Sequence, residues 1–173
     1  SLFTGLRLGE VCALKWSNID LENSILYITT TMQRVQNLSI EGPKTKVYVS
    51  EPKSACSIRE IPIPDMLLRL LANFSNNGSC YFLTGSSEKF IEPRNLQYHF
   101  KTVLKKALIF DMNFHALRHT FATRCIEVGV DIKTLSEILG HANVNITLNR
   151  YVHPSLEEKR LNMEKLSEFL TVN

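Results

Sequence analysis

The sequence predicts an α+β fold that is mainly helical, with helices around a small antiparallel β-sheet of about three strands. Between Ile25 and Pro64, short β-branched and aromatic runs alternate with turn-forming residues, a pattern typical of hairpins. From residue 65 onward, apolar residues recur mainly at helical spacing, with short breaks between segments. A length of 173 residues with 44% apolar residues is sufficient for one domain with its own core.

The first half of the chain supplies the strands. A helix is expected over residues 8–15, where apolar side chains fall at helical spacing. The run ILYITTT at 25–31 predicts a strand, and extended runs follow at 35–40, 46–51 and 57–64. The breakers EGPKT and PKSA between them favour two hairpins within one small sheet. Pro62 and Pro64 place the last run at an edge or an exit, because proline cannot donate to a central ladder.

The second half is expected to be almost entirely helical. The only exception is a short strand, CYFL, at 80–83. Pro93 suits the first turn of a helix that reaches about Leu108. The remaining helices are predicted over 65–74, 115–128, 132–140, 144–152 and 155–170.

Composition excludes several classes of protein. No apolar run is long enough to span a membrane, and the first residues do not resemble a signal peptide, so we expect a cytoplasmic protein without a membrane partner. The four cysteines stand apart without a CxxC motif, which argues against a structural zinc site and favours free thiols. A formal net charge of +3 is compatible with a nucleic-acid partner.

A few polar positions could together carry phosphate chemistry. Arginine offers a permanently charged planar fork to two phosphate oxygens, and Arg7 and Arg118 are candidates for this role. Tyr151, in a polar setting, could act as a nucleophile if neighbouring cations favour its phenolate. A lysine in a hairpin turn, Lys53, or a histidine could protonate the leaving oxygen. The candidate histidines are His115, which shares a helix face with Arg118, and His141 after Gly140.

Three motifs give the chain a specific resemblance. TGLRLGEVCALKWSNID resembles the first arginine motif of the tyrosine recombinase (phage integrase) family. HALRHTFATRCIEVGVDIKTLSEILGHANVNITLNRYVH resembles the family's His-x-x-Arg, Leu-Gly-His and terminal Tyr motifs, in the same order. PKSACSIREIPIP resembles the hairpin that carries the family lysine. The match runs from about residue 2 to 153 and implies the tyrosine recombinase catalytic-domain fold.

The resemblance implies a role for six residues. Arg7 and Arg118 would clamp the scissile phosphate, and Tyr151 would attack it to leave a 3′-phosphotyrosyl link. Lys53, chosen over Lys46 for its distance from SIREIPIP, would protonate the departing 5′ oxygen. His115 would assist proton transfer at the tyrosine, and His141 would hydrogen-bond the phosphate. Neither a metal nor a cofactor is expected.

The neighbouring polar residues are expected to be structural. His119, next to Arg118, points about 100 degrees away from it round the helix and is expected to be structural. Glu10 and Asp20 are expected to hold local helix and turn geometry, for instance by bracing an arginine, rather than to bind a metal. Gly5 and Gly140 are expected to form tight turns that present Arg7 and His141.

The resemblance also implies an assembly on DNA. The expected partners are double-stranded DNA, three further copies in a homotetramer and accessory DNA-bending or excision factors. The apolar residues of 155–170 suit either packing within the chain or docking on a neighbouring protomer. Residues 1–173 would form a catalytic domain lacking its first helix or so and the upstream core-binding and arm-binding domains.

The leading hypothesis is therefore a site-specific recombinase that integrates or excises a bacterial mobile element or prophage. A type IB topoisomerase is the alternative with the same chemistry, although the short spacing from Leu-Gly-His to Tyr favours the recombinase. A non-cleaving DNA-binding remnant of an integrase is the alternative from another class, and the complete set of six residues argues against it.

Overall fold

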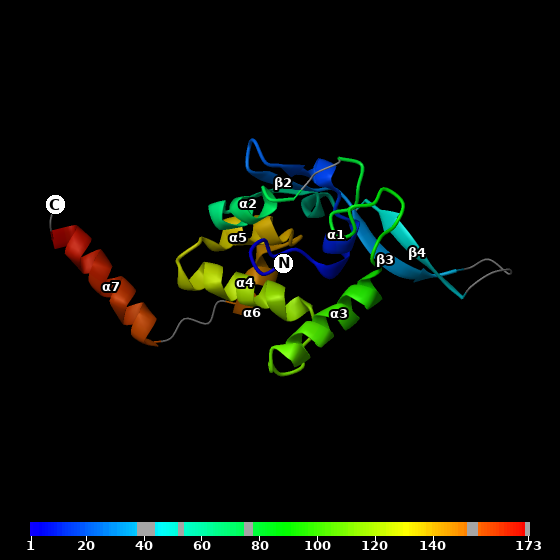
Figure 1. Cartoon of the computed structure of the whole chain (residues 1–173). Helices are drawn as coiled ribbons and strands as arrows, with labels where there is room; N and C mark the ends of the chain where they lie inside the picture. The colour runs from blue at the N-terminus through cyan, green and yellow to red at the C-terminus, as the bar shows by residue number, and fades with distance from the viewer. Residues whose placement is uncertain (38–43, 52–53, 75–77, 152–155, 172–173) are drawn as a thin grey trace.

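The computed structural model describes residues 1–37, 44–51, 54–74, 78–151 and 156–171 (Figure 1). These residues form a mainly helical α+β fold, which confirms the predicted class. The helices are α1 (Leu8–Ala13), α2 (Asp65–Leu71), α3 (Pro93–Lys106), α4 (His115–Glu127), α5 (Ile132–Leu139), α6 (Val144–Tyr151) and α7 (Leu156–Thr171). The strands are β1 (Ile19–Asp20), β2 (Ile25–Ile28), β3 (Thr31–Gln36), β4 (Thr45–Ser50) and β5 (Arg59–Pro62).

The strands form two antiparallel units rather than the single sheet expected. The three-stranded sheet has the order β1-β2-β5, and Leu26 of β2 lies opposite Ile61 of β5. β3 and β4 form a separate hairpin, with Met32 opposite Val49. The predicted strand 25–31 divides because Leu26 and Ile28 join the core of the sheet, whereas Met32 packs in a different cluster with Cys12 and Ala13 of α1.

Residues 80–83 do not form the predicted strand. Their backbone pairs with the segment after α1: the amide of Trp16 donates to the carbonyl of Cys80 (3.0 Å), and the amide of Phe82 donates to Leu14 (2.8 Å). One isolated bridge, between Lys15 and Tyr81, results. The apolar residues that suggested a strand instead cover the core, where Phe82 lies 5.1 Å from the Trp16 ring.

Two apolar clusters hold the candidate residues in place. One lies on the buried side of the three-stranded sheet and includes Leu26, Ile61 and Leu71 of α2. The other joins α4 and α5 through Ala122, Leu135 and Leu139, all fully buried, and Tyr151 of α6 packs against it. Because burial of each of the two leucines stabilises the packing by about 2 kcal/mol, α4, α5 and α6 hold the residues at their ends in place.

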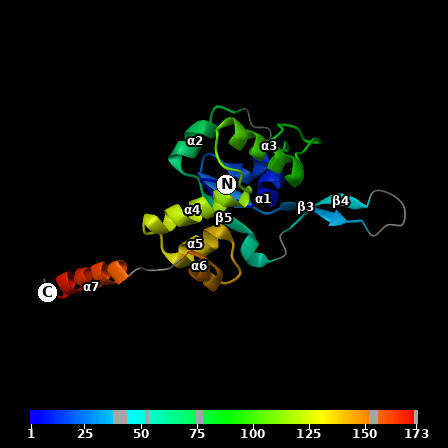
Figure 2. The ribbon, with the colours of Figure 1, turned by 90° about the horizontal axis from the view of Figure 1, so that it is seen from below.

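The two ends of the molecule differ from this packed body. In both views the β3–β4 hairpin extends from one end, and α7 lies apart at the other (Figures 1 and 2). Every residue of α7 whose burial is described is exposed. No helix among the described residues is long and apolar enough to cross a membrane.

Candidate active site

Arg7 lies at the N-terminus of α1, just after a tight turn. Gly5 adopts a φ of +64°, which glycine tolerates without strain, as the sequence predicted for this turn. The Arg7 amide donates to Oε2 of Glu10 (2.8 Å), which caps the helix, and its guanidinium donates to Oε1 of the same carboxylate (2.7 Å). The Arg7 side chain is 34% exposed. Glu10 thus fixes both the backbone and the side chain of an arginine that solvent can still reach.

Arg118 comes from α4 but points into the interior. It is 1% exposed, and its two terminal nitrogens donate to the carbonyls of Gly5 and Leu139, both at 2.7 Å. Burial, followed by repulsion from Arg7, lowers the pKa of Arg118 to about 9, so it is still charged at neutral pH. A phosphate could contact Arg118 only after the side chains around it rearrange.

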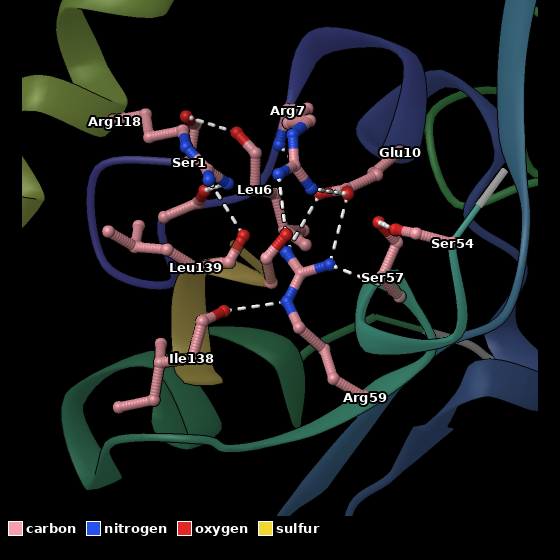
Figure 3. Close-up of polar contacts among 12 residues, drawn as sticks. Ser1, Leu6, Arg7, Glu10, Ser54, Ser57, Arg59, Arg118, Ile138 and Leu139 are labelled. Atoms are coloured by element: carbon pink, nitrogen blue, oxygen red, sulfur yellow. Dashed lines mark hydrogen bonds and ion pairs between the residues drawn. The ribbon is translucent and has the colours of Figure 1, made fainter. Parts of the chain in front are cut away.

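Three arginines converge on the C-terminal end of α5 (Figure 3). Arg59 Nε donates to Ile138 (2.6 Å), Arg118 to Leu139 (2.7 Å) and Arg7 to Gly140 (2.8 Å). The last carbonyls of a helix lack partners within it and carry the negative end of its dipole, so they suit guanidinium groups. We call Arg7, Arg59 and Arg118 the arginine cluster. It joins segments that lie 52 to 111 positions apart in the sequence.

Glu10 is the carboxylate that makes this cluster possible. The two terminal nitrogens of Arg59 donate hydrogen bonds to the two carboxylate oxygens of Glu10, at 3.0 and 2.9 Å. Burial alone would raise the pKa of Glu10, but the hydrogen bonds and charge of Arg59, with hydrogen bonds from Arg7, lower it to about 2. Three cations around one anion leave a net charge of plus two, which suits a phosphodiester.

Sequence reasoning did not identify Arg59 as part of the site, although it expected Glu10 or Asp20 to brace an arginine. A signal was present, because Arg59 stands two positions before the buried Ile61 on strand β5 and therefore shares its face. An arginine at an inward-facing position needs a buried partner. Its partner, Glu10, lies 49 positions away, a separation that local patterns do not reveal.

His141 follows α5 and is held by α6. Gly140 ends α5 with a φ of +65°, as expected of a turn that presents His141. The Nδ1 of His141 lies 2.8 Å from the hydroxyl oxygen of Thr147, which is fully buried. Burial, followed by repulsion from Arg118 and Arg7, lowers the pKa of His141 to about 4. A neutral ring at pH 7 whose Nδ1 accepts from Thr147 would carry its proton on Nε2, ready to donate.

Tyr151 is the last residue of α6, and its hydroxyl contacts His119. The Tyr151 oxygen lies 2.7 Å from Nδ1 of His119, a residue that we expected to be structural. His115, expected to assist the tyrosine, instead packs edge-on against the His119 ring, with centroids 4.6 Å apart. The sequence did carry a signal for the contact between His115 and His119, because residues four positions apart share a helix face.

The predicted lysine lies outside the described residues. The turn that follows it is described: Ser54 and Ser57 join their hydroxyls at 2.8 Å, and Arg59 donates to the carbonyl of Ser57 (3.1 Å). Lys53 itself is among the residues whose structure is not described. The competing Lys46 is exposed on β4, opposite Val35. Arg59 therefore anchors the segment next to Lys53 to the arginine cluster.

The described residues offer no group of three or more His, Cys, Asp or Glu side chains suited to a metal ion. Glu10 is occupied by arginines, as described above. Asp20 closes a turn, accepting from the backbone and side-chain nitrogens of Asn23 at 2.9 and 2.8 Å. Both acidic residues thus have the structural contacts that the sequence predicted.

The chain matches known proteins over nearly its whole length. The model of the phage integrase family matches residues 1–158. A tyrosine recombinase XerC-like protein of Caldanaerobacter subterraneus is 36% identical over 95% of this chain and 46% of its own length. The transposase of transposon Tn916 from Enterococcus faecalis is 30% identical over 98% of this chain and 45% of its own. The chain thus spans about half the length of these curated relatives.

Solved structures share the fold. An integrase of transposon Tn1549, in complex with a circular intermediate DNA, is similar over 95% of this chain and 56% of its own, with a TM-score of 0.74 and 28% identity. The XerA recombinase is similar in fold over 95% of this chain and 52% of its own, with a TM-score of 0.61 and 24% identity.

Proposed function

Because the chain belongs to the phage integrase family, we propose that residues 1–173 form the catalytic domain of a site-specific tyrosine recombinase. The observation that carries this proposal is the arginine cluster, which gathers positive charge at the end of α5, with Arg118 close enough to Tyr151 to favour its charged form. A cationic site of this kind stabilises the charge that develops on a phosphodiester under attack. A metal ion is not needed for that stabilisation when the cations are already in place.

In the proposed reaction, Tyr151 attacks the scissile phosphate. Its oxygen bonds to phosphorus, the bond to the 5′ oxygen breaks, and the DNA 3′ end stays on the protein. Arg7, the more exposed arginine, meets the phosphate first, and Arg118 joins after its surroundings rearrange. His141 donates to a non-bridging oxygen. Lys53 protonates the 5′ oxygen as it leaves. The bond energy is kept in the phosphotyrosyl link, so rejoining to another 5′ end requires no ATP.

We further propose that double-stranded DNA is the substrate and that the active assembly is a homotetramer. The Tn1549 integrase, similar in structure, was solved in complex with DNA. The exposed apolar residues of α7, among them Leu161 and Leu166, suit packing on a neighbouring protomer. Accessory DNA-bending or excision factors would assist, and the relatives' bacterial hosts support action in a bacterial cytoplasm on a mobile element or prophage.

A covalent-trapping assay tests the function. The protein is mixed in EDTA with end-labelled, nicked duplexes tiled across the genomic DNA that adjoins its gene, and the mixture is denatured in SDS. A labelled protein–DNA adduct is expected with the wild-type protein and with Tyr98→Phe, which changes an exposed tyrosine of α3. Tyr151→Phe should give no adduct. An adduct that persists in Tyr151→Phe would contradict the assignment of the nucleophile.

A further inference from the structure

The hydroxyl of Tyr151 must lose a proton when it attacks phosphorus, and the group in contact with it is His119. Among the described residues, the only hydrogen bond of this hydroxyl is the 2.7 Å contact with Nδ1 of His119. The two rings also pack together, tilted at 55° with centroids 5.7 Å apart. His115, on the preceding turn of α4, packs edge-on against His119 and restricts how its ring can turn.

This arrangement resembles the general logic of an activated nucleophile. Such a nucleophile lies within hydrogen-bond reach of a base, and a third group orients that base. Here Tyr151 is the nucleophile, His119 the base and His115 the orienting group. We propose that His119 is a catalytic residue that accepts the Tyr151 proton during cleavage and returns it during rejoining, an inference that rests on the proposed function.

The proton balance is complete. As the Tyr151 oxygen bonds to phosphorus, its proton passes to Nδ1 of His119, which becomes a cation. The 5′ oxygen leaves with a proton from Lys53. In the rejoining step the 5′ hydroxyl gives its proton back to Lys53 as it attacks phosphorus, the Tyr151 oxygen leaves, and His119 returns the proton to it. Each group ends in its starting state.

The charges around the pair favour a neutral histidine before attack. Burial lowers the pKa of His119 below its usual 6.5, and Arg150 of α6 and Arg118 of α4 lower it further. Burial raises the pKa of Tyr151 above its usual 10, and the same two arginines offset part of that rise. His119 is therefore free to accept at pH 7, whereas Tyr151 stays protonated and needs a base.

Other titratable groups face the same surface. His115 adjoins His119 on α4, and its pKa is also lowered, first by burial and then by His119 and Arg118. Arg124 and Glu127, ion-paired at 2.6 Å, line the same depression as His119 farther along α4. From α6 the facing groups are Arg150 and Tyr151. A pH profile must therefore be compared between variants rather than interpreted alone.

The test separates proton transfer from simple positioning. In His119→Asn the amide oxygen can still accept the Tyr151 hydrogen bond but cannot take the proton at neutral pH. We expect single-turnover adduct formation to slow by about 100-fold, the lower end of general-base effects, with an unchanged melting temperature. The wild-type rate should decrease as the pH is lowered below 6.5, because His119 becomes protonated. The residual rate of His119→Asn should instead rise tenfold per pH unit from 6 to 9, as the fraction of ionised Tyr151 rises. His99→Asn, a histidine of α3 without a proposed role, is the control and should behave as wild type.

A second measurement needs no DNA. With tyrosine labelled at Cζ with carbon-13, the Tyr151 resonance, identified by its loss in Tyr151→Phe, should shift as His119 titrates below pH 6.5. That shift should vanish in His119→Asn. A wild-type cleavage rate and pH profile in His119→Asn, or a Tyr151 resonance indifferent to His119, would overturn the proposal. If the wild-type protein forms no adduct at all, the proposed function fails, and the resonance still reports on the contact.

Discussion

At the scale of single residues, Arg59 links the most parts of the site. Its guanidinium reaches Glu10 near the start of α1, the carbonyl of Ile138 at the end of α5 and the carbonyl of Ser57 in the turn before β5. Arg7 and Arg118 meet the same end of α5, so a shift of Arg59 would be passed to both. The Arg59 side chain is only 6% exposed, which leaves its charge for internal contacts.

Glu10 should make the protein sensitive to acid. Its folded pKa, about 2, lies below the ordinary value of 4.5, so its contribution to stability is complete above pH 4.5 and is lost as the pH falls toward 2. Over this window the depressed pKa is worth about 3 kcal/mol. We therefore expect the stability gap between wild type and Glu10→Gln to shrink by about that amount from pH 5 to pH 2.

Urea denaturation at a series of pH values measures this gap. Glu164→Gln, on the exposed helix α7, is the matched control and should keep the wild-type pH dependence. If Glu10→Gln lost stability in acid as steeply as the wild type, the carboxylate would not be charged and braced as described.

At the scale of elements, three helices are followed by a residue with a left-handed backbone, which is Gly129 after α4, Gly140 after α5 and Leu108 after α3. α5 ends in Gly140 with a φ of +65°, and α3 ends just before Leu108 with a φ of +56°. The Ile109 amide donates back to Leu104 (3.0 Å), closing the turn around Leu108, which is 94% exposed. A left-handed residue other than glycine is strained, and here no packing compensates for that strain.

Leu108→Gly should therefore raise the free energy of unfolding by about 1 kcal/mol, because it relieves strain without removing buried surface. Gly140→Ala should lower it by about 1 to 2 kcal/mol, since the added methyl carbon would lie 3.0 Å from Arg59 Nη1 and 3.1 Å from the Cys56 carbonyl oxygen. Thermal and urea unfolding measure both. Val103→Gly, within α3, serves as the control for Leu108→Gly and should destabilise. Destabilisation by Leu108→Gly would contradict the strain assigned to that turn.

At the scale of the whole molecule, the sequence predicted the fold class and the seven α-helices of the described residues, because helical periodicity and turn residues are local signals. It did not predict the split between the sheet and the β3–β4 hairpin, since strand pairing depends on which cluster each strand joins. The motifs predicted Arg7, Arg118, His141 and Tyr151 as site residues, and these four lie at or near the ends of α1, α4, α5 and α6. The contacts of Arg59 and His119 required the tertiary structure.

The central claim, that Tyr151 carries the DNA 3′ end during the reaction, is tested most directly by mapping the adduct. Trypsin should release residues 151–159, between Arg150 and Lys159, as one peptide. After nuclease digestion, mass spectrometry should find a 3′-linked nucleotide on Tyr151, and the released DNA strand should carry a free 5′ hydroxyl that a kinase labels without phosphatase treatment. A nucleotide on any other peptide, or a 5′ phosphate on the released strand, would contradict the account.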